Sequence, residues 1–228
     1  MNKIKLMLLI AGMISLVSCS KDNYDAPNAG LHGSFIDDAT NELVQQDIIG
    51  GTQIEFIEHG YDPFEIQTMI VKTDGTYANS LMFANTYTIQ PKRGNFVELA
   101  PQDLQVNGQT QLDFRVVPYI RVLQPSITIA GTIVTATFKL QQTVVNNVRK
   151  IGLYVHSDSR VGEPMRLVAS EQNLNAPSDP NTTYTLTMDV AASSSILKTG
   201  KNHYFRIGAL IDAGEAKPNY APAVMIPL

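Results

Sequence analysis

The stretch Val134-Thr-Ala-Thr-Phe-Lys-Leu140 decides the fold class of this chain of 228 residues. Its apolar side chains occupy every second position, and the positions between them hold two threonines and a lysine. Because successive side chains of a β-strand point to opposite faces of the sheet, this alternation predicts a strand with one face in a core and the other in water. The stretch therefore favours a β-sandwich over a helical fold.

The same alternation recurs along the chain, and clear amphipathic helical patterns are absent. Runs of period two separated by Gly, Pro, Asn and Asp predict short strands joined by turns, and hence an all-β protein. In the first half, the predicted strands are Leu31–Ile36, Thr52–Ile57, Ile66–Val71, Tyr87–Ile89 and Leu112–Val117. In the second half, they are residues 134–140, 151–155, 184–190 and 203–211. The last of these is apolar on both faces, which suits the centre of a sheet.

A proline marks the predicted boundary between two domains. Pro118 stands in Val117-Pro118-Tyr119, and because proline cannot donate a hydrogen bond within a central strand, it indicates the edge or the exit of a sheet. The chain beyond its N-terminal region is long enough for two ordinary β-domains. We therefore predict one β-sandwich at residues 28–118 and a second at residues 119–228.

The N-terminus has the layout of a signal peptide, predicted at residues 1–18. Lys3 and Lys5 precede an apolar run at residues 6–17, which is shorter than the roughly 20 residues that a membrane-spanning helix needs. Leu16-Val17-Ser18-Cys19 resembles the bacterial lipobox. That resemblance implies cleavage before Cys19 and a lipid anchor on its sulfur, followed by a polar tether at residues 19–27. The alternative is that Cys19 is merely the last residue of an uncleaved or otherwise cleaved leader.

Composition excludes several classes of protein. Cys19 is the one cysteine, so no intrachain disulfide is possible. The 17 basic and 21 acidic residues give a net charge of −4, and no basic cluster occurs outside the signal peptide. Binding to nucleic acid needs concentrated Lys and Arg, so we expect no nucleic-acid partner. We expect the membrane to be contacted through the lipid on Cys19.

The sequence lacks the patterns of catalytic and metal sites. It contains neither Gly-x-Ser-x-Gly nor His-Glu-x-x-His. Its histidines have no paired spacing, and the Asp37-Asp38 pair is better explained by an Asx turn than by calcium. The histidines are His32, His59, His156 and His203. We therefore predict a protein that is not an enzyme and has neither a metal site nor a cofactor.

Carbohydrate binding is the specific function that the residues themselves suggest. The segment from Glu58 to Phe64 lies between two predicted strands, and its Tyr61, Asp62 and Phe64 combine ring faces with a hydroxyl acceptor. We predict these three residues as a ligand-binding loop, against the alternative that the rings fold back over the end of the sandwich. Tyr154 and His156 form a second candidate patch, or else they cover the sheet.

The first domain resembles the carboxypeptidase-regulatory-like, or transthyretin-like, β-sandwich. The matching positions are Gly33, Phe35, Asp37, Thr40, Leu43, Val44, Gly50-Gly51, Ile54-Glu55-Phe56, Thr73-Asp74-Gly75-Thr76-Tyr77, Leu81 and Tyr87-Thr88-Ile89. Asp74-Gly75 is favourable for a hairpin turn because glycine adopts positive φ without a steric penalty. Ala84-Asn85 replaces the usual Pro-Gly, so Asn85 is expected to take the left-handed conformation. The resemblance implies a scaffold or binding role.

The second domain resembles a fibronectin type III or immunoglobulin-like sandwich. The match lies in Tyr204-Phe205-Arg206-Ile207-Gly208-Ala209 as the penultimate strand, with residues 223–228 as the last. The chain has no tryptophan, so Phe138 or a neighbour is expected to fill the core position that the family gives to that residue.

Taken together, the lipobox, the two sandwiches and the junction at residues 118–122 resemble the DUF3823-like two-domain lipoproteins of gut Bacteroidetes. Such proteins often accompany SusC/SusD-type glycan importers. The resemblance implies a non-catalytic lipoprotein of the outer membrane, facing the cell exterior, that binds or presents glycan for an importer. The alternatives are a periplasmic orientation, and a structural or interaction lipoprotein that stabilises a surface complex without binding sugar.

Overall fold

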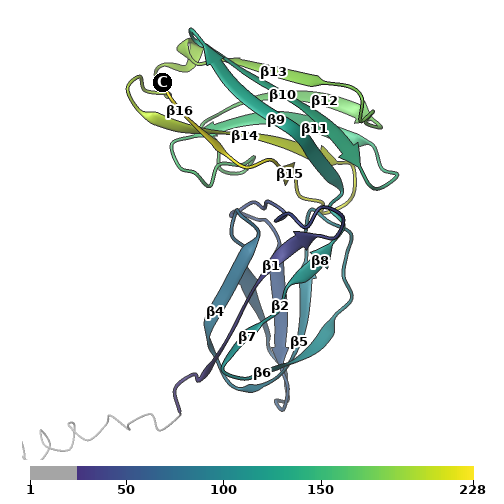
Figure 1. Ribbon diagram of the computed structural model, residues 1–228. Helices are drawn as coiled ribbons and strands as arrows, with labels where there is room; N and C mark the ends of the chain where they lie inside the picture. Colours follow the sequence, from purple (N-terminus) through teal and green to yellow (C-terminus); the bar gives the residue numbers. More distant parts are fainter. Residues whose placement is uncertain (1–24) are drawn as a thin grey trace, which may run out of the picture.

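The computed structural model describes residues 25–228. These residues form two β-sandwiches stacked end to end, which confirms the predicted fold class (Figure 1). The predicted signal peptide, Cys19 and most of the predicted tether lie outside the described residues. Within residues 25–228, no helix is long and apolar enough to cross a membrane.

The first sandwich is built from two sheets. One has the order β4-β1-β7, with β8 also paired to β1, and the other has the order β3-β2-β5-β6. All neighbours are antiparallel except β7 and β8, which run parallel to β1. The strands are β1 (Ala29–Asp37), β2 (Gln53–Glu58), β3 (Ile66–Ile70), β4 (Thr76–Met82), β5 (Asn85–Lys92), β6 (Gln102–Val106), β7 (Gln109–Gln111) and β8 (Phe114–Val116).

The second sandwich packs a sheet of order β13-β10-β9 against one of order β12-β11-β14-β15, with β16 also paired to β14. Its strands are β9 (Ile120–Ala130), β10 (Ile133–Gln142), β11 (Val148–His156), β12 (Val168–Ala176), β13 (Tyr184–Asp189), β14 (Asn202–Ile211), β15 (Asn219–Tyr220) and β16 (Val224–Pro227). A short 3-10 helix, η1 (Ala191–Ser193), follows β13. The predicted central position of residues 203–211 is confirmed, because β14 has a paired strand on each side.

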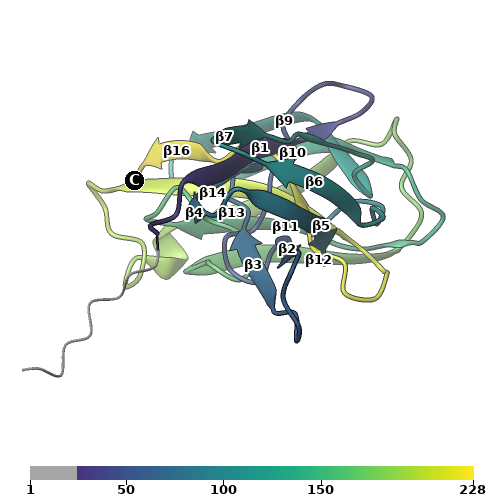
Figure 2. The same cartoon turned by 90° about the horizontal axis from the view of Figure 1, so that it is seen from below.

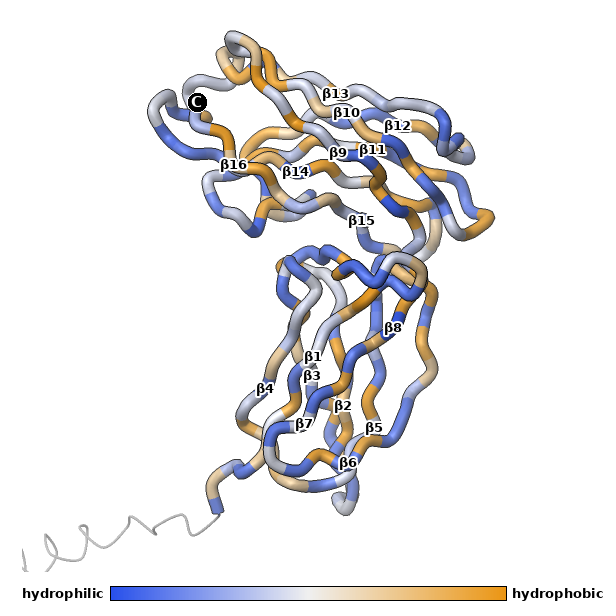
Figure 3. Tube along the Cα trace, in the orientation of Figure 1, coloured by the Kyte–Doolittle hydropathy of each residue, from blue (hydrophilic) through white to orange (hydrophobic). Residues whose placement is uncertain are grey.

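Each sandwich has its own apolar core, and hydrophobic and hydrophilic residues alternate along many strands of both (Figure 3). The four apolar residues of the stretch at 134–140 are all buried in the second core. Phe138 is 1% exposed and stacks against Tyr184 with ring centroids 5.9 Å apart. Phe138 therefore fills the core position expected for it in a chain without tryptophan.

The two sandwiches meet through a buried arginine on β14. Arg206 is 1% exposed, and its guanidinium donates to the carbonyl oxygens of Gln46 and Thr73 in the first sandwich, at 3.0 and 3.1 Å. It also donates to the carbonyl oxygens of Val161 and Ala221 in its own domain. Four backbone carbonyls from separate segments thus converge on one side chain and link the domains.

Asp47 and Tyr220 lie beside this arginine. The guanidinium carbon of Arg206 lies 4.3 Å from the centroid of the Tyr220 ring, and the Tyr220 hydroxyl donates to Asp47 Oδ2 at 2.9 Å. Burial raises the pKa of Asp47 to about 7, although the Tyr220 hydrogen bond and the Arg206 charge oppose that rise. Burial also lowers the pKa of Arg206 to about 10, so its side chain stays charged at neutral pH.

A second link joins the start of β9 to the end of β1. Arg121 donates from Nε and Nη2 to both carboxylate oxygens of Asp37, at 2.5 and 2.8 Å. Asp37 Oδ1 also accepts from the backbone N–H of Ala39, which confirms the predicted Asx turn. Nearby, the Asn95 side-chain amide donates to the carbonyl of Pro218 at 3.1 Å, and the Asn219 side-chain amide donates to the carbonyl of Asn95 at 2.8 Å. The two domains are therefore held by directional bonds at several points.

The buried Asp47 predicts a pH dependence of stability. Its pKa in the folded protein, about 7, lies above the ordinary value of 3.8. Because the folded state binds the proton more tightly, the free energy of unfolding falls as pH rises from about 4 to about 7, by about 3–4 kcal/mol from this group. Asp47→Asn should remove that decline in urea denaturation measured across pH. The exposed Asp212→Asn should keep it, and an Asp47→Asn profile parallel to wild type would contradict the assignment.

Candidate functional site

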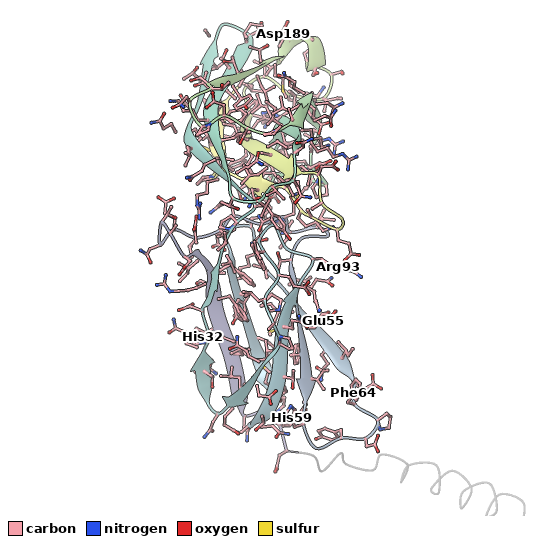
Figure 4. All side chains as sticks on the ribbon, turned by 90° about the vertical axis from the view of Figure 1, so that its right-hand side faces the viewer. His32, Glu55, His59, Phe64, Arg93 and Asp189 are labelled. Atoms are coloured by element: carbon pink, nitrogen blue, oxygen red, sulfur yellow. The ribbon has the colours of Figure 1, made fainter. Side chains whose placement is uncertain are left out.

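The candidate binding loop runs from Glu58 to Phe64 and joins β2 to β3. It lies at the end of the first sandwich that faces away from the second, where Figure 4 labels His59 and Phe64. Figure 2 views the molecule from this end. The loop leaves the paired strands after Glu58, and Gly60 then turns the chain with φ of 97°. The loop therefore projects from a rigid sheet, as binding loops on sandwiches do.

The base of the loop is fixed to β5. The backbone N–H of His59 donates to the carbonyl of Thr86 at 3.0 Å, and the His59 ring lies 2.8 Å from Thr88 Oγ1. The Asn85 amide donates to Glu58 Oε1 and to the carbonyl of His59, each at 3.0 Å. The prediction that Asn85 takes the left-handed conformation is wrong. Asn85 is the first residue of β5 and has a negative φ, and it fixes the loop through the hydrogen bonds of its side chain.

The two rings of the loop are open to solvent. Tyr61 is 64% exposed and Phe64 is 60% exposed, so the alternative in which they fold back over the sandwich does not hold. Tyr61 borders a hollow of about 220 Å³, shared with Pro63 and the polar side chains Glu58, Glu65 and Gln67. The loop thus offers apolar faces next to hydrogen-bonding groups, which is the chemistry predicted for it.

Hydrogen-bond acceptors are plentiful at this site. Glu58 Oε1 is held by Asn85, while Asp62 on the loop and Glu65 directly after it are exposed. Beneath them, Tyr87 is buried and donates its hydroxyl to the carbonyl of Phe83 at 2.9 Å. Burial, reinforced by the Glu58 charge, raises the pKa of Tyr87 to about 12. The Tyr87 hydroxyl therefore remains a neutral structural donor under the exposed part of the loop.

The predicted second patch at Tyr154 and His156 does not form. Tyr154 is 1% exposed, and its hydroxyl donates to Glu171 Oε1 at 3.0 Å. Its side chain does point to the outer face of the sheet, as its parity predicts, but Val161 and Tyr220 pack over it. His156 is half-buried, and its Nδ1 accepts from the backbone N–H of Asp158. The prediction of an exposed patch is wrong for Tyr154, and the alternative that this residue covers the sheet is right.

Sequence reasoning named residues 118–122 as the junction but missed Arg206, Asp47 and Gln46. Arg206 carried a signal, since a charged residue within the apolar stretch of 203–211 requires buried partners. Asp47 and Gln46 carried none, because they lie in an irregular segment between β1 and β2. Two grooves flank this junction, of about 460 and 640 Å³, and their walls combine both domains.

The described residues contain no arrangement typical of a metal centre. No group of three or more His, Cys, Asp or Glu side chains within residues 25–228 is placed to hold a metal ion. The binding of a ligand by Tyr61, Asp62 and Phe64 stays a prediction.

Solved structures from Bacteroides and Parabacteroides species are similar to this chain. One from Bacteroides uniformis, described as a "putative carbohydrate binding protein", is 36% identical, covers 89% of this chain and 100% of its own, and superposes with a TM-score of 0.81. A DUF3823 family protein from Parabacteroides merdae is 20% identical over 89% of this chain and 100% of its own, with a TM-score of 0.76. A Bacteroides ovatus member is 22% identical over 88% and 99%, with a TM-score of 0.73. No curated protein matches.

Family models match both halves of the chain. The model described as "Protein of unknown function (DUF3823) N-terminal domain" matches residues 29–117, and the model described as "Domain of unknown function (DUF3823_C)" matches residues 120–225. One of these structures is described as a "putative carbohydrate binding protein" and the matching family models as of unknown function, and none of these descriptions names a catalytic family. Since the two models together span most of the sequence, this chain belongs to the two-domain DUF3823 family.

Proposed function

We propose that this protein is a non-catalytic lipoprotein that binds glycan through the loop from Glu58 to Phe64. The observation that carries the proposal is the exposure of Tyr61 and Phe64 on a loop with carboxylate neighbours. A relative that is 36% identical and described as a "putative carbohydrate binding protein" supports the same class of ligand.

The loop suits a sugar for chemical reasons. The C–H face of a pyranose packs on an aromatic ring, while its hydroxyls donate to carboxylates such as Asp62 and Glu65. Pro63 restricts the backbone next to both rings, which lowers the conformational entropy that binding has to remove. Because the carboxylates accept but do not donate, the loop favours ligands rich in free hydroxyl groups over acidic sugars.

The location of the protein belongs to the same proposal. Leu16-Val17-Ser18-Cys19 supports lipidation at Cys19, and two or more acyl chains anchor a protein stably. We place the protein on the outer membrane, facing the exterior, where it serves a SusC/SusD-type importer. The similar proteins from gut Bacteroides support this setting.

Tyr61→Ala is expected to weaken glycan binding about tenfold. An exposed ring contributes on the order of 1–2 kcal/mol to binding, whereas its removal leaves the core untouched, so the melting temperature should stay within a degree or two. A glycan array identifies the sugar, and titration calorimetry measures the affinity. Leu81→Ala, which removes an equally exposed side chain outside the loop, is the control and should bind as wild type does. If the wild-type protein binds no glycan on the array, the interaction-protein alternative replaces this proposal.

A further inference from the structure

The end of the first sandwich that carries the candidate loop is also where the chain arrives from Cys19. The backbone N–H of Asn28 donates to the carbonyl of Met82 at 3.1 Å, and Asn28 Oδ1 accepts from the N–H of Ala84 at 2.9 Å. Asn28 is thereby fixed to the β4–β5 turn, and β5 in turn holds the base of the loop. We call residues 25–29, 58–66 and 81–86 together the tether end.

The length of the chain before Asn28 limits how far the tether end can lie from a lipid anchor. Asn28 is nine positions after Cys19, and a fully extended chain over nine positions spans about 30 Å. A flexible chain of that length has a mean span of roughly 15–18 Å. If Cys19 is lipidated, as the proposed function holds, the tether end faces the membrane and the second sandwich points away from it.

The tether end exposes apolar side chains beyond those of the candidate loop. Leu81 is 74% exposed, Phe83 is 41% exposed and Ile66 is 55% exposed. Clustered exposed hydrophobic residues of this kind mark interaction sites more often than free surface. Leu81 lies at the end of β4 and Phe83 on the turn that follows and fixes Asn28, so both lie on the part of the molecule nearest to the proposed anchor.

The charge of the tether end limits which kinds of surface can bind to it. Its three segments contain the carboxylates Asp25, Glu58, Asp62 and Glu65, and they contain no lysine or arginine. Anionic lipid headgroups repel such a surface, because membrane-binding loops need basic residues to approach them. A protein surface with an apolar pocket and a rim of Lys and Arg complements both features.

We propose that the tether end docks onto a protein embedded in the same membrane, with Leu81 and Phe83 in an apolar pocket and Asp62 and Glu65 against a basic rim. The inference rests on the proposed function in one respect, the lipid anchor at Cys19. The docking proposal places the partner at the membrane-facing end of the molecule and leaves the second sandwich free of contact with that partner. It also brings the candidate glycan loop next to that partner.

Photo-crosslinking in the full-length, lipidated protein tests the proposal. Leu81→p-benzoylphenylalanine, expressed in the host bacterium, should form an adduct with an integral membrane protein. The same replacement at Ile133 should not, since Ile133 pairs with Asp189, which Figure 4 places at the opposite end of the molecule. Phe83→Asp and Asp62→Lys, each introduced beside the probe at position 81, should lower the adduct at least fivefold while the melting temperature is retained.

Three results would overturn the docking proposal: adducts with lipid alone, equal adducts from positions 81 and 133, or adducts insensitive to Phe83→Asp and Asp62→Lys. Labelling with a fatty-acid analogue, compared between wild type and Cys19→Ala, tests the anchor separately. If Cys19 carries no label, the anchor and the docking proposal both fail. If the label and glycan binding are present but position 81 forms no protein adduct, the docking proposal alone fails.

Discussion

Arg206→Met should destabilise the protein by about 3–5 kcal/mol, because it removes a buried cation that donates to several buried acceptors. The carbonyl oxygens of Gln46, Val161 and Ala221 lose this donor, and that of Thr73 keeps only the backbone N–H of Gln46. Gln46 and Thr73 belong to the first sandwich, so the variant also weakens the link between the domains. In urea, we expect one unfolding transition for the wild-type protein and two separate transitions for the variant.

Arg160→Met is the matched control for this experiment. Arg160 lies in the same domain but on the surface, where it pairs with Asp158. Its replacement should leave the urea midpoint unchanged. If Arg206→Met unfolds at the same urea concentration as the control, the carbonyls find other donors or water, and the buried arginine does not join the domains energetically.

Phe138→Ala should cost about 3–5 kcal/mol, the usual range for removing a large buried ring. Phe138 lies in the middle of β10, is 1% exposed and stacks on Tyr184. Its loss leaves a cavity in the core of the second sandwich, which has no tryptophan to fill it. The first sandwich has a separate core and depends on the second only through the junction, so a probe placed within residues 29–117 should report a smaller loss than a probe placed in the second sandwich.

Ile133→Ala on the same strand is the comparison for Phe138→Ala. Ile133 is 40% exposed, so its truncation removes less buried surface and should cost clearly less. Equilibrium denaturation of both variants gives the difference. Equal losses for the two variants would mean that Phe138 is not a core residue.

The strands with regular alternation could be predicted from the sequence, because one face of each is buried. The turn at Asp74-Gly75 was also predictable, and Gly75 has the positive φ expected of it, 87°. Gly33, matched only by resemblance, has a clear physical reason: a Cβ at this position would lie 1.8 Å from the carbonyl oxygen of Leu112. Local sequence patterns therefore predicted the structure correctly where that structure is a single strand or a single turn.

The edge strands β9 and β12 could not be predicted, for reasons visible in their residues. Strand β9 contains Pro125, and Gln124 just before it has a φ of 50°, close to where the pairing of β9 with β10 shifts register. Such a bulge reverses which residues face the core and hides the alternation. Strand β12 is largely polar and exposed, so it has no apolar period to detect.

The candidate site was predicted in part. The sequence placed Tyr61 and Phe64 on a connection between strands, but their exposure could not be deduced, since a ring in a loop can equally cover the end of a core. Tyr154 shows the converse, because its outward parity was right and the segment that covers it comes from residues far along the chain. The sequence of a strand does not show whether a distant segment of the chain packs over its outer face.

The bonded junction between the sandwiches determines how the protein moves on a surface. With Arg206, Asp37 and Asn95 bonded across the domain boundary, bending at that boundary is restricted. Under the proposed anchor at Cys19, the two sandwiches would therefore reorient on the membrane as one rigid body. The second sandwich would then sweep a wider arc than the loop near Asn28, and a ligand bound at that loop would stay close to the lipid in every orientation of the molecule.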